Sequence, residues 1–318
     1  MRAVWLPRFG PPEVLVPGPA PDPRPGPGQV VIEVAHANLT FVETMFRATG
    51  FGPFPRDLPV IPGNGVGGRI REVGSDVDPA LVGLAVVSAT GGTGGYAERV
   101  AVPASAPLPV PDGLPLDAAV ALLADGRTAL LLARAAGLRP GERVLVEAAA
   151  GGVGTLLTQL ATAAGARVVA AAGGAHKTAL LRQRGLDVVI DYREPDWAER
   201  VRAATGGVDV VLDGVGGPIA RTAFDLLGPG GRMLSFGMAG GSWADLSPES
   251  AATRGITLLR PSAPPDELRA LTARALAEGA AGRLRPLIGQ RFPLEQAAAA
   301  HAAIESRATT GKTLLDLP

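Results

Sequence analysis

Apolar and polar residues alternate along the first part of the chain, up to about residue 115. The segments 29–37 (QVVIEVAHA) and 67–74 (GGRIREVG) have the two-residue period of strands with one buried face, and 94–104 (GGYAERVAVPA) follows a glycine-rich turn. Glycine and proline interrupt this region so often that we expect only one short helix, near residues 41–48. The pattern predicts a β-rich domain with many turns.

From residue 116 the pattern changes to short apolar strands that alternate with helices. A helical stretch begins at Leu116 and ends near Gly137 and Pro140. Such alternation predicts a parallel sheet with helices on both faces, which is a doubly wound domain. The expected strands are 143–148, 167–172, 187–191, 208–214 and 231–237, and the expected helices are 152–164, 177–184, 196–204 and one after Pro218.

The last part of the chain follows the segment 256–262 (ITLLRPS) and is too short to form a domain alone. Its pattern predicts a helix at 265–278, a strand at 284–289, a helix at 294–305 and a final strand at 311–317. We therefore expect it to complete the first domain. The predicted fold class is α/β, with residues 1–115 and 260–318 in one domain and 116–259 in the other.

The composition limits the partners and the location of the protein. Of the 318 residues 47% are hydrophobic and 19% charged, and the formal net charge of zero gives no reason to expect nucleic acid as a partner. The absence of cysteine excludes thiolate metal sites and fits a cytoplasmic protein. The uncharged run 148–166 is long enough to cross a bilayer, but its glycines and threonines favour a strand, a turn and a buried helix, so we expect no membrane partner.

A glycine-rich turn joins the first strand of the second domain to its helix. Gly151, Gly152 and Gly154 lie between the apolar segment 143–146 and the helical segment that follows. At such a turn a phosphate can approach the free N–H groups of a helix N-terminus, because no side chains intervene. In a strand–helix–strand context this spacing predicts a dinucleotide site, with a ligand-free tight turn as the alternative.

The end of the second strand indicates which dinucleotide binds. An NAD site usually has an Asp or Glu about 20 residues beyond the glycines, bound to the ribose 2′-hydroxyl. Here the strand ends in Gly173 and Gly174, with Lys177 just beyond, and the first acidic residue after Glu147 is Asp187. Glycines leave room for a 2′-phosphate and a lysine supplies positive charge, so we predict NADPH. The alternative is that Lys177 is only a solvated helix residue.

A competing Rossmann family has a catalytic Tyr-x-x-x-Lys pair. The two tyrosines of this chain, Tyr96 and Tyr192, are followed four residues later by Val100 and Asp196. The sequence therefore does not match that family.

Three segments resemble the quinone oxidoreductase, or zeta-crystallin-like, group of medium-chain dehydrogenase/reductases. They are 137–146 (GLRPGERVLV), 141–162 (GERVLVEAAAGGVGTLLTQLAT) and 292–315 (FPLEQAAAAHAAIESRATTGKTLL). The second departs from the group's pattern at Thr162, where Lys, Arg or Ser is usual. The resemblance covers the whole chain and implies a GroES-like catalytic domain, a Rossmann domain, an active site in the cleft between them, and a homodimer.

The resemblance also implies a set of cofactor-binding residues. Gly151, Gly152 and Val153 would face the pyrophosphate, and Gly173, Gly174, Lys177 and Tyr192 the adenosine phosphate or the adenine. Val215, Phe236, Gly237 and Met238 would border the nicotinamide, while Thr128 and Arg260 would complete the cleft.

Zinc-dependent relatives carry the motif Gly-His-Glu-x-x-Gly-x5-Gly-x-x-Val. The matching segment, 63–77 (GNGVGGRIREVGSDV), has Asn64 and Gly65 in place of the His and Glu. The three histidines are expected on a strand (His36), in an exposed loop (His176) and on a helix face (His301). We therefore predict no metal site.

The group's Asn-x-x-Asp-x-Tyr-x-Arg-x-Gly-x-Tyr segment aligns with 40–51 (TFVETMFRATGF). Met45 and Phe51 replace the two tyrosines, so we expect an apolar substrate pocket without a phenol. Our hypothesis places four polar side chains in the catalytic cleft: Thr40, Arg47, Asp125 and Thr128. Two alternatives remain, namely that Arg47 pairs with Glu43 four residues earlier and that Asp125 caps a helix.

Without a metal to polarise it, the substrate is expected to carry its own electrophilic conjugated system. The first hypothesis is an NADPH-dependent reductase of quinones or other conjugated carbonyls, in which the protein positions and shields the reactants. The second is a C=C reductase of enones or enoyl compounds in specialised metabolism. The third, from another class, is an NADPH-binding protein without catalysis.

Overall fold

The chain forms two compact units in the computed structural model, which describes residues 1–55 and 57–317. The first unit consists of Met1–Ala124 and Thr272–Pro318, and the second of Asp125–Leu271. Both limits fall inside helices, α2 (Leu116–Ala136) and α8 (Pro265–Ala280). The domain limits predicted from the sequence, after residues 115 and 259, stay a prediction.

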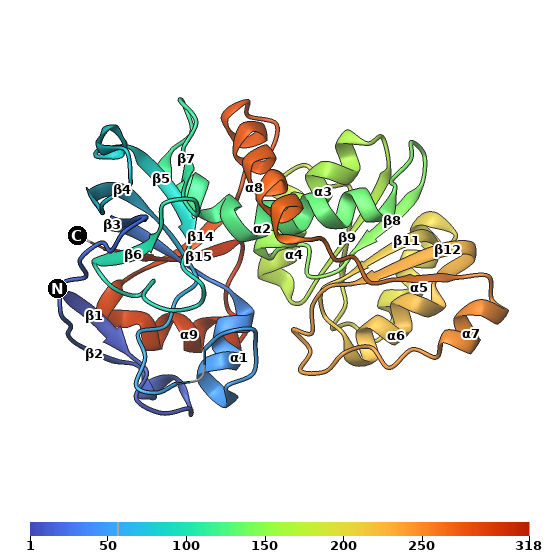
Figure 1. The fold of residues 1–318 in the computed structure, drawn as a ribbon. Coiled ribbons are helices and arrows are strands. Elements are labelled where there is room, and N and C mark those ends of the chain that lie inside the picture. The colour runs from blue at the N-terminus through green and yellow to red at the C-terminus, as the bar shows by residue number, and fades with distance from the viewer. Residues whose placement is uncertain (56, 318) are drawn as a thin grey trace. The chain divides into compact units, whose positions relative to one another are not determined.

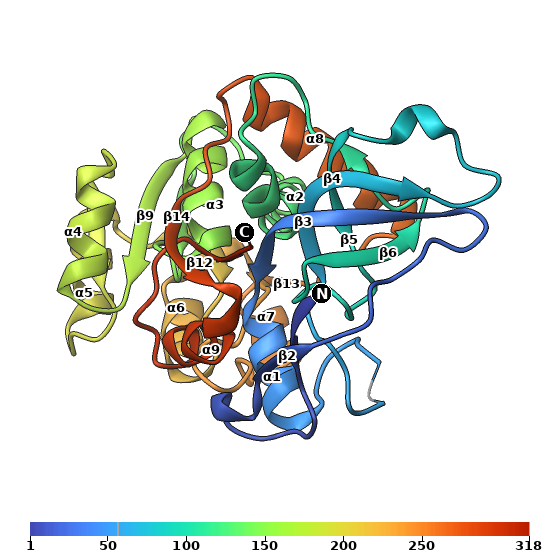
Figure 2. The ribbon, with the colours of Figure 1, turned by 90° about the vertical axis from the view of Figure 1, so that its left-hand side faces the viewer.

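The first unit is built on a mostly antiparallel sheet that joins strands from the first part of the chain to its last two strands. Within the described residues its strands follow the order β14-β15-β3-β4-β5-β7, and β6 also pairs with β3 (Figures 1 and 2). The bounds are β3 (Gln29–Leu39), β4 (Gly65–Val73), β5 (Ala85–Ala89), β6 (Arg99–Pro103), β7 (Leu108–Pro109), β14 (Ile288–Pro293) and β15 (Lys312–Asp316). The C-terminal strand β15 pairs with β3 antiparallel, with Thr313 opposite Leu39. The last segment therefore completes the sheet begun by the first.

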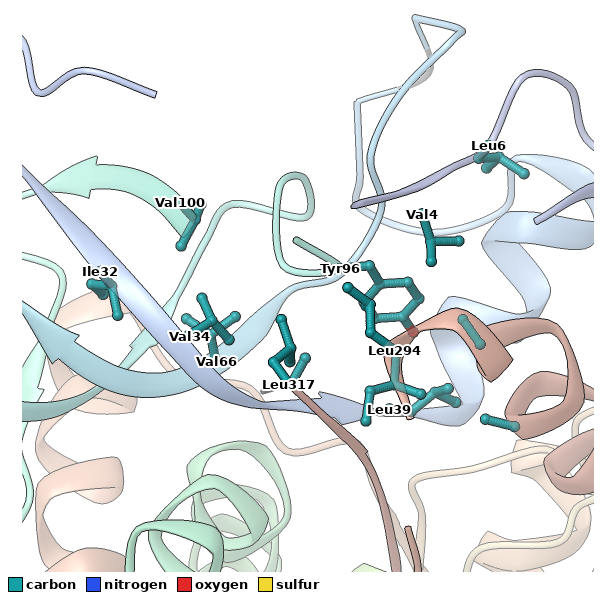
Figure 3. Close-up of a cluster of buried hydrophobic side chains, with 14 of the residues drawn as sticks. Val4, Leu6, Ile32, Val34, Leu39, Val66, Tyr96, Val100, Leu294 and Leu317 are labelled. Carbon is teal, nitrogen blue, oxygen red and sulfur yellow. The ribbon is translucent and has the colours of Figure 1, made fainter. Parts of the chain in front are cut away.

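Smaller elements cover the core of the first unit. They are β1 (Arg2–Trp5), β2 (Val16–Pro19), the helices α1 (Phe41–Thr49) and α9 (Ala297–Glu305), and the 3-10 turns η1 (Pro12–Val14), η2 (Pro79–Leu81) and η3 (Leu294–Gln296). Helix α1 begins at a capping box formed by Thr40 and Glu43 and ends at Gly50, which has a left-handed φ of 73°. Tyr96 lies in the core beside Val4, Leu39 and Leu294 (Figure 3).

The second unit is a parallel sheet with helices on both faces. The order of its described strands is β10-β9-β8-β11-β12-β13, and every pairing is parallel. The strands are β8 (Arg143–Val146), β9 (Arg167–Ala172), β10 (Val188–Asp191), β11 (Val208–Asp213), β12 (Leu227–Ser235) and β13 (Thr257–Leu259). The strand order reverses between β8 and β11, which is the place where doubly wound folds bind ligands.

The helices of this sheet connect consecutive strands, as the alternating pattern predicts. They are α3 (Gly152–Ala163), α4 (Ala175–Gln183), α5 (Trp197–Thr205), α6 (Gly217–Asp225) and α7 (Pro248–Thr253). Trp197, Val201, Phe224 and Ala251 share one buried cluster, so α5, α6 and α7 cover the same face (Figure 1). The predicted fold class, a GroES-like β-rich domain with a Rossmann domain, is confirmed.

Two local predictions are wrong. The strand expected at 284–289 begins only at Ile288, because Arg283 and Leu284 donate their N–H groups to Glu278 O and still belong to the C-terminal turn of α8. His176, expected in a loop, is the second residue of α4; it is exposed, because that helix begins directly after Gly174. Helix α7 is not apparent in the hydrophobic pattern.

Candidate cofactor and active site

The predicted cofactor residues of the second unit follow six neighbouring parallel strands. The glycine turn follows β8, Gly173 follows β9, Tyr192 follows β10, Val215 follows β11, Phe236 follows β12 and Arg260 follows β13. Because the strands are parallel, these segments lie along the same carboxyl edge of the sheet. The fold thus gathers residues that are more than 100 positions apart in the sequence.

The glycine turn leaves the N-terminus of α3 open. Gly151 is the N-cap and provides no side-chain cap, so the first N–H groups of the helix have no partner within it. Ala148 has a left-handed φ of 47°, and a Cβ at Gly154 would lie 2.2 Å from Ala148 O. Only a glycine lets the helix pack this closely on the turn. The result is a side-chain-free helix end of the kind that binds phosphate.

At the end predicted to bind the adenosine phosphate, two side chains lie over the glycine pair, Gly173 and Gly174. A Cβ on Gly173 would lie 2.8 Å from Tyr192 Cε2 and 2.9 Å from Arg193 Nε, and one on Gly174 would lie 3.1 Å from Arg193 Nη1. Gly174 also has a φ of 98° and is the N-cap of α4, which carries Lys177 in its first turn. This cradle, formed by Gly173, Gly174, Tyr192 and Arg193, is closely packed and carries the guanidinium of Arg193, a group that binds phosphate.

Arg193 was missed by the sequence analysis, as was its neighbour Asp191. The Asp191 carboxylate accepts hydrogen bonds from Gly174 N at 2.9 and 3.0 Å and from Arg193 N at 3.0 Å. An acidic group thus does lie beside the glycine pair, but it comes from the next strand and binds backbone N–H groups. The signal that could have identified Arg193 is its position directly after Tyr192.

At the end predicted to border the nicotinamide, two turns pack backbone against backbone. Asp213 Oδ1 accepts hydrogen bonds from Val215 N and Gly216 N, each at 2.8 Å, and Phe236 N donates to Asp213 O at 2.8 Å. A Cβ on Gly216 would lie 2.0 Å from Ser242 O. The turn at 213–216 and the segment 236–242 therefore form one closely packed wall at the ends of β11 and β12.

The residues predicted for catalysis and for the substrate pocket divide between the two units. Thr40, Met45, Arg47 and Phe51 belong to the first unit, and Asp125 and Thr128 to the second. Thr40 N and Oγ1 both donate to Glu43 Oε2 at 2.7 Å, and Asn64 N donates to Glu43 Oε1 at 2.9 Å. Burial raises the pKa of Glu43, and these hydrogen bonds oppose the rise.

Arg47 is only 1% exposed, and its guanidinium donates to Gly10 O and to the carboxylate of Glu305. The alternative pair with Glu43 is therefore wrong, because Glu43 binds Thr40 and Asn64 instead. Asp125 lies inside α2, so the expectation that it could cap a helix is also wrong.

The other predicted pocket residues differ in exposure. Phe51 is 52% exposed, whereas Met45 and Thr128 are half-buried on α1 and α2. Among residues 1–55 and 57–317 no group of three or more His, Asp or Glu side chains is placed to hold a metal ion. In the same residues no helix combines the length and apolar character needed to cross a membrane.

Comparisons with known proteins identify the family. The model described as alcohol dehydrogenase GroES-like domain matches residues 26–112, and the one described as zinc-binding dehydrogenase matches 152–275. The quinone oxidoreductase of Pseudomonas aeruginosa is 34% identical over 316 residues, which cover 96% of this chain and 97% of that protein. The chain belongs to the quinone oxidoreductase family. The family predicted from the sequence is thus confirmed.

Solved structures agree with this assignment. The quinone oxidoreductase of Escherichia coli, solved in complex with NADPH, has a TM-score of 0.90 and 30% identity, with both chains covered completely. A mycobacterial protein, also solved in complex with NADPH, has a TM-score of 0.89 and 35% identity over the full length of both chains.

Proposed function

We propose that this quinone oxidoreductase family member transfers hydride from NADPH to a quinone or another conjugated carbonyl compound. As a member of the family the chain is an oxidoreductase, and its cofactor is NADPH. The observation in this structure that carries the proposal is the cradle at Gly173 and Gly174, over which Tyr192 and Arg193 lie. The guanidinium of Arg193, with Lys177 in the first turn of α4, supplies positive charge that suits the 2′-phosphate, which distinguishes NADPH from NADH.

Bound NADPH would supply the hydride, and the protein would supply position and shielding. The N–H groups of Gly152 and Val153, at the start of α3, would bind the pyrophosphate. Lys177 and Arg193 would bind the 2′-phosphate. The turn at Val215 and the segment that follows β12 would border the nicotinamide and keep water from it.

In the first unit, we propose that Met45 and Phe51 present apolar surface to a flat conjugated substrate. Thr40 would contribute polar contact with its hydroxyl, which Glu43 orients. The two hydrogen bonds of the buried Arg47 favour a structural role for that residue, since they join α1 to Gly10 and to Glu305. Asp125 and Thr128 remain candidates on α2.

The proposal is tested by the steady-state oxidation of NADPH and of NADH, with 1,2-naphthoquinone, 9,10-phenanthrenequinone and a set of enones as hydride acceptors. We expect quinone turnover with a clear preference for NADPH. K177A and R193A should each lower kcat/KM for NADPH about 10- to 100-fold, because a hydrogen bond to a charged group contributes about 1.5–3 kcal/mol. Both variants should leave kcat/KM for NADH nearly unchanged.

R200A is the matched control, because Arg200 is an exposed arginine on α5. Equal use of NADH, with no effect of K177A or R193A, would show that the cradle is not a phosphate site. Turnover of enones without turnover of quinones would favour the C=C reductase. Tight NADPH binding without turnover of either class would favour the non-catalytic alternative.

A further inference from the structure

Two buried carboxyl groups lie on either side of the point where the strand order of the parallel sheet reverses. Glu147 directly follows β8 and Asp213 is the last residue of β11, and both are 0% exposed. Their strands are paired, and Glu147 N donates to Leu212 O at 3.0 Å. The pair therefore lies beneath the carboxyl edge that carries the cofactor residues.

Three of the four carboxyl oxygens of this pair have no hydrogen-bond donor. They are Oε1 and Oε2 of Glu147 and Oδ2 of Asp213, and all three are buried. Two ionised carboxylates at neighbouring positions of paired strands, without donors and away from water, would be strongly destabilising. A single proton between them removes both problems, since it neutralises one group and gives the other a donor.

The surroundings decide which group holds this proton. Asp213 Oδ1 already accepts hydrogen bonds from two backbone N–H groups, whereas neither carboxyl oxygen of Glu147 accepts one. Burial raises the pKa of Glu147 well above its usual range, and the charge and hydrogen bond of Asp213 raise it further. Helix α3 contains no ionisable residue. Arg167 and Asp209 lie near the N-terminal ends of β9 and β11, away from the carboxyl edge at which the pair lies. The proton therefore belongs on Glu147.

We propose that Glu147 is a positioning residue: its neutral carboxyl group donates a proton to Asp213 Oδ2 and so fixes the carboxylate that organises the turn at Val215 and Gly216. This turn is joined to the next one, because Gly240 N donates to Val215 O at 2.6 Å and Phe236 N to Asp213 O at 2.8 Å. Loss of the proton would place two negative charges next to the turn at 213–216 and the segment 236–242, which are proposed to border the nicotinamide. The identity of the ligand rests on the proposed function, whereas the shared proton does not.

Infrared spectroscopy in D2O tests the shared proton directly, without any cofactor. At pH 7 the wild type minus E147Q difference spectrum should contain the C=O stretch of one protonated carboxyl group. The control E199Q changes an exposed carboxylate on α5 and should give no such band. If the C=O band is also absent from the wild type minus E147Q difference spectrum, the proposal is overturned.

The pH dependence of unfolding gives a second test that is independent of the cofactor. A carboxyl group whose pKa is raised by folding makes the folded state less stable as pH rises from the unfolded to the folded pKa. Relative to E147Q, the wild type should therefore lose about tenfold in its folding equilibrium constant per pH unit above about 4.5. Parallel pH profiles for the two proteins would contradict a protonated Glu147.

NADPH affinity, measured by fluorescence between pH 6 and 10, tests the positioning role. E147Q keeps a donor for Asp213, so its Kd at pH 7 should lie within about threefold of the wild type and should not weaken at high pH. E147A leaves Asp213 Oδ2 without a donor and should weaken binding about tenfold or more. Equal Kd values and equal pH profiles for E147A and E147Q would show that Glu147 does not position the turn.

The two proposals can fail separately. If wild-type protein does not bind NADPH at any pH, the proposed function is wrong, and the infrared and unfolding experiments still decide the protonation of Glu147. If NADPH binds but E147Q loses affinity as much as E147A, Glu147 does not act as a neutral donor, and the cofactor site stands.

Discussion

Two glycines of the proposed cofactor site have different surroundings, and alanine substitutions separate their roles. A Cβ at Gly154 would meet the backbone oxygen of Ala148 at 2.2 Å, so we expect G154A to lower the free energy of unfolding by about 1–3 kcal/mol or more. A Cβ at Gly173 would meet only the ends of Tyr192 and Arg193, which can move. G173A should therefore keep its stability but raise KM for NADPH. Thermal unfolding and steady-state kinetics measure the two effects.

G228A is the matched control, because a Cβ at Gly228 would meet no atom within 4 Å. It should change neither property. A fully stable G154A would show that the turn can move away from α3. An unchanged KM for NADPH in G173A would indicate that Tyr192 and Arg193 do not contact the cofactor.

At this scale the sequence identified the glycines of the cradle and Lys177, but not Asp191 and Arg193 beside them. Glycines at the end of a strand are a local signal, because their spacing is fixed by the turn and the helix that follows. Asp191 and Arg193 reach Gly174 only because β10 pairs with β9, with Asp191 opposite Ala172. That register depends on the folded sheet and cannot be read from the residues around Gly173.

Helix α1 illustrates the same limit for a whole element. Its bounds, Phe41–Thr49, are close to the predicted 41–48, because the capping box and Gly50 mark the two ends locally. The partners of its charged side chain Arg47 could not be predicted from the sequence. Arg47 binds Glu305 at the end of α9, 258 residues away in the sequence. The alignment placed Arg47 toward a cleft, whereas its contacts are with Gly10 and α9.

Helix α9 carries a buried histidine that should make the protein sensitive to acid. His301 is 1% exposed and its Nε2 lies 3.0 Å from Tyr96 Oη. Burial, and secondarily the charge of Arg47, lowers the pKa of His301 from 6.5 to about 3. The unfolded state therefore binds a proton that the folded state does not, and stability is lost as pH falls from about 6.5 toward 3.

Urea unfolding between pH 4.5 and 7.5 checks this dependence. The wild type should lose up to about 1.4 kcal/mol per pH unit on the acid side relative to H301L, which has no group to titrate. Y96F/H301L also removes the hydroxyl that H301L leaves without its partner, so it is the better-folded comparison. H176Q changes an exposed histidine and should keep the wild-type slope. A wild-type slope that persists in Y96F/H301L would assign the acid sensitivity to other groups.

For the molecule as a whole, the sequence predicted the doubly wound unit more completely than the β-rich one. Buried parallel strands form continuous apolar runs separated by helices, so each strand from β8 to β12 has a signal of its own. The first unit is closed by β14 and β15, whose partners are distant in sequence, and the strand expected at 284–289 was misplaced by four residues at each end. The C-terminal turn of a helix and an edge strand can each contain a short apolar segment, and hydrophobicity alone does not distinguish the two.

This division leads to a prediction about where NADPH should act. Its proposed contacts are on backbone segments of the second unit, so hydrogen exchange should slow most at 151–155, 173–178, 214–216 and 236–240. NADPH at about 100 times its Kd stabilises the folded state by about 2.7 kcal/mol, so amides that exchange only by unfolding of that unit should slow by up to about 100-fold. Mass spectrometry of peptides with and without NADPH measures both effects.

NADH at the same concentration distinguishes phosphate recognition from general dinucleotide binding. It should protect 151–155, where the pyrophosphate would bind, and should protect 173–178 less than NADPH does, because NADH has no 2′-phosphate to bind Lys177 and Arg193. Equal protection of 173–178 by both nucleotides would contradict the phosphate site. Protection centred on β3 or β4, without change at the glycine turn, would contradict cofactor binding at the carboxyl edge. The experiment thus tests the location and the selectivity of the site in one measurement, without requiring knowledge of the substrate.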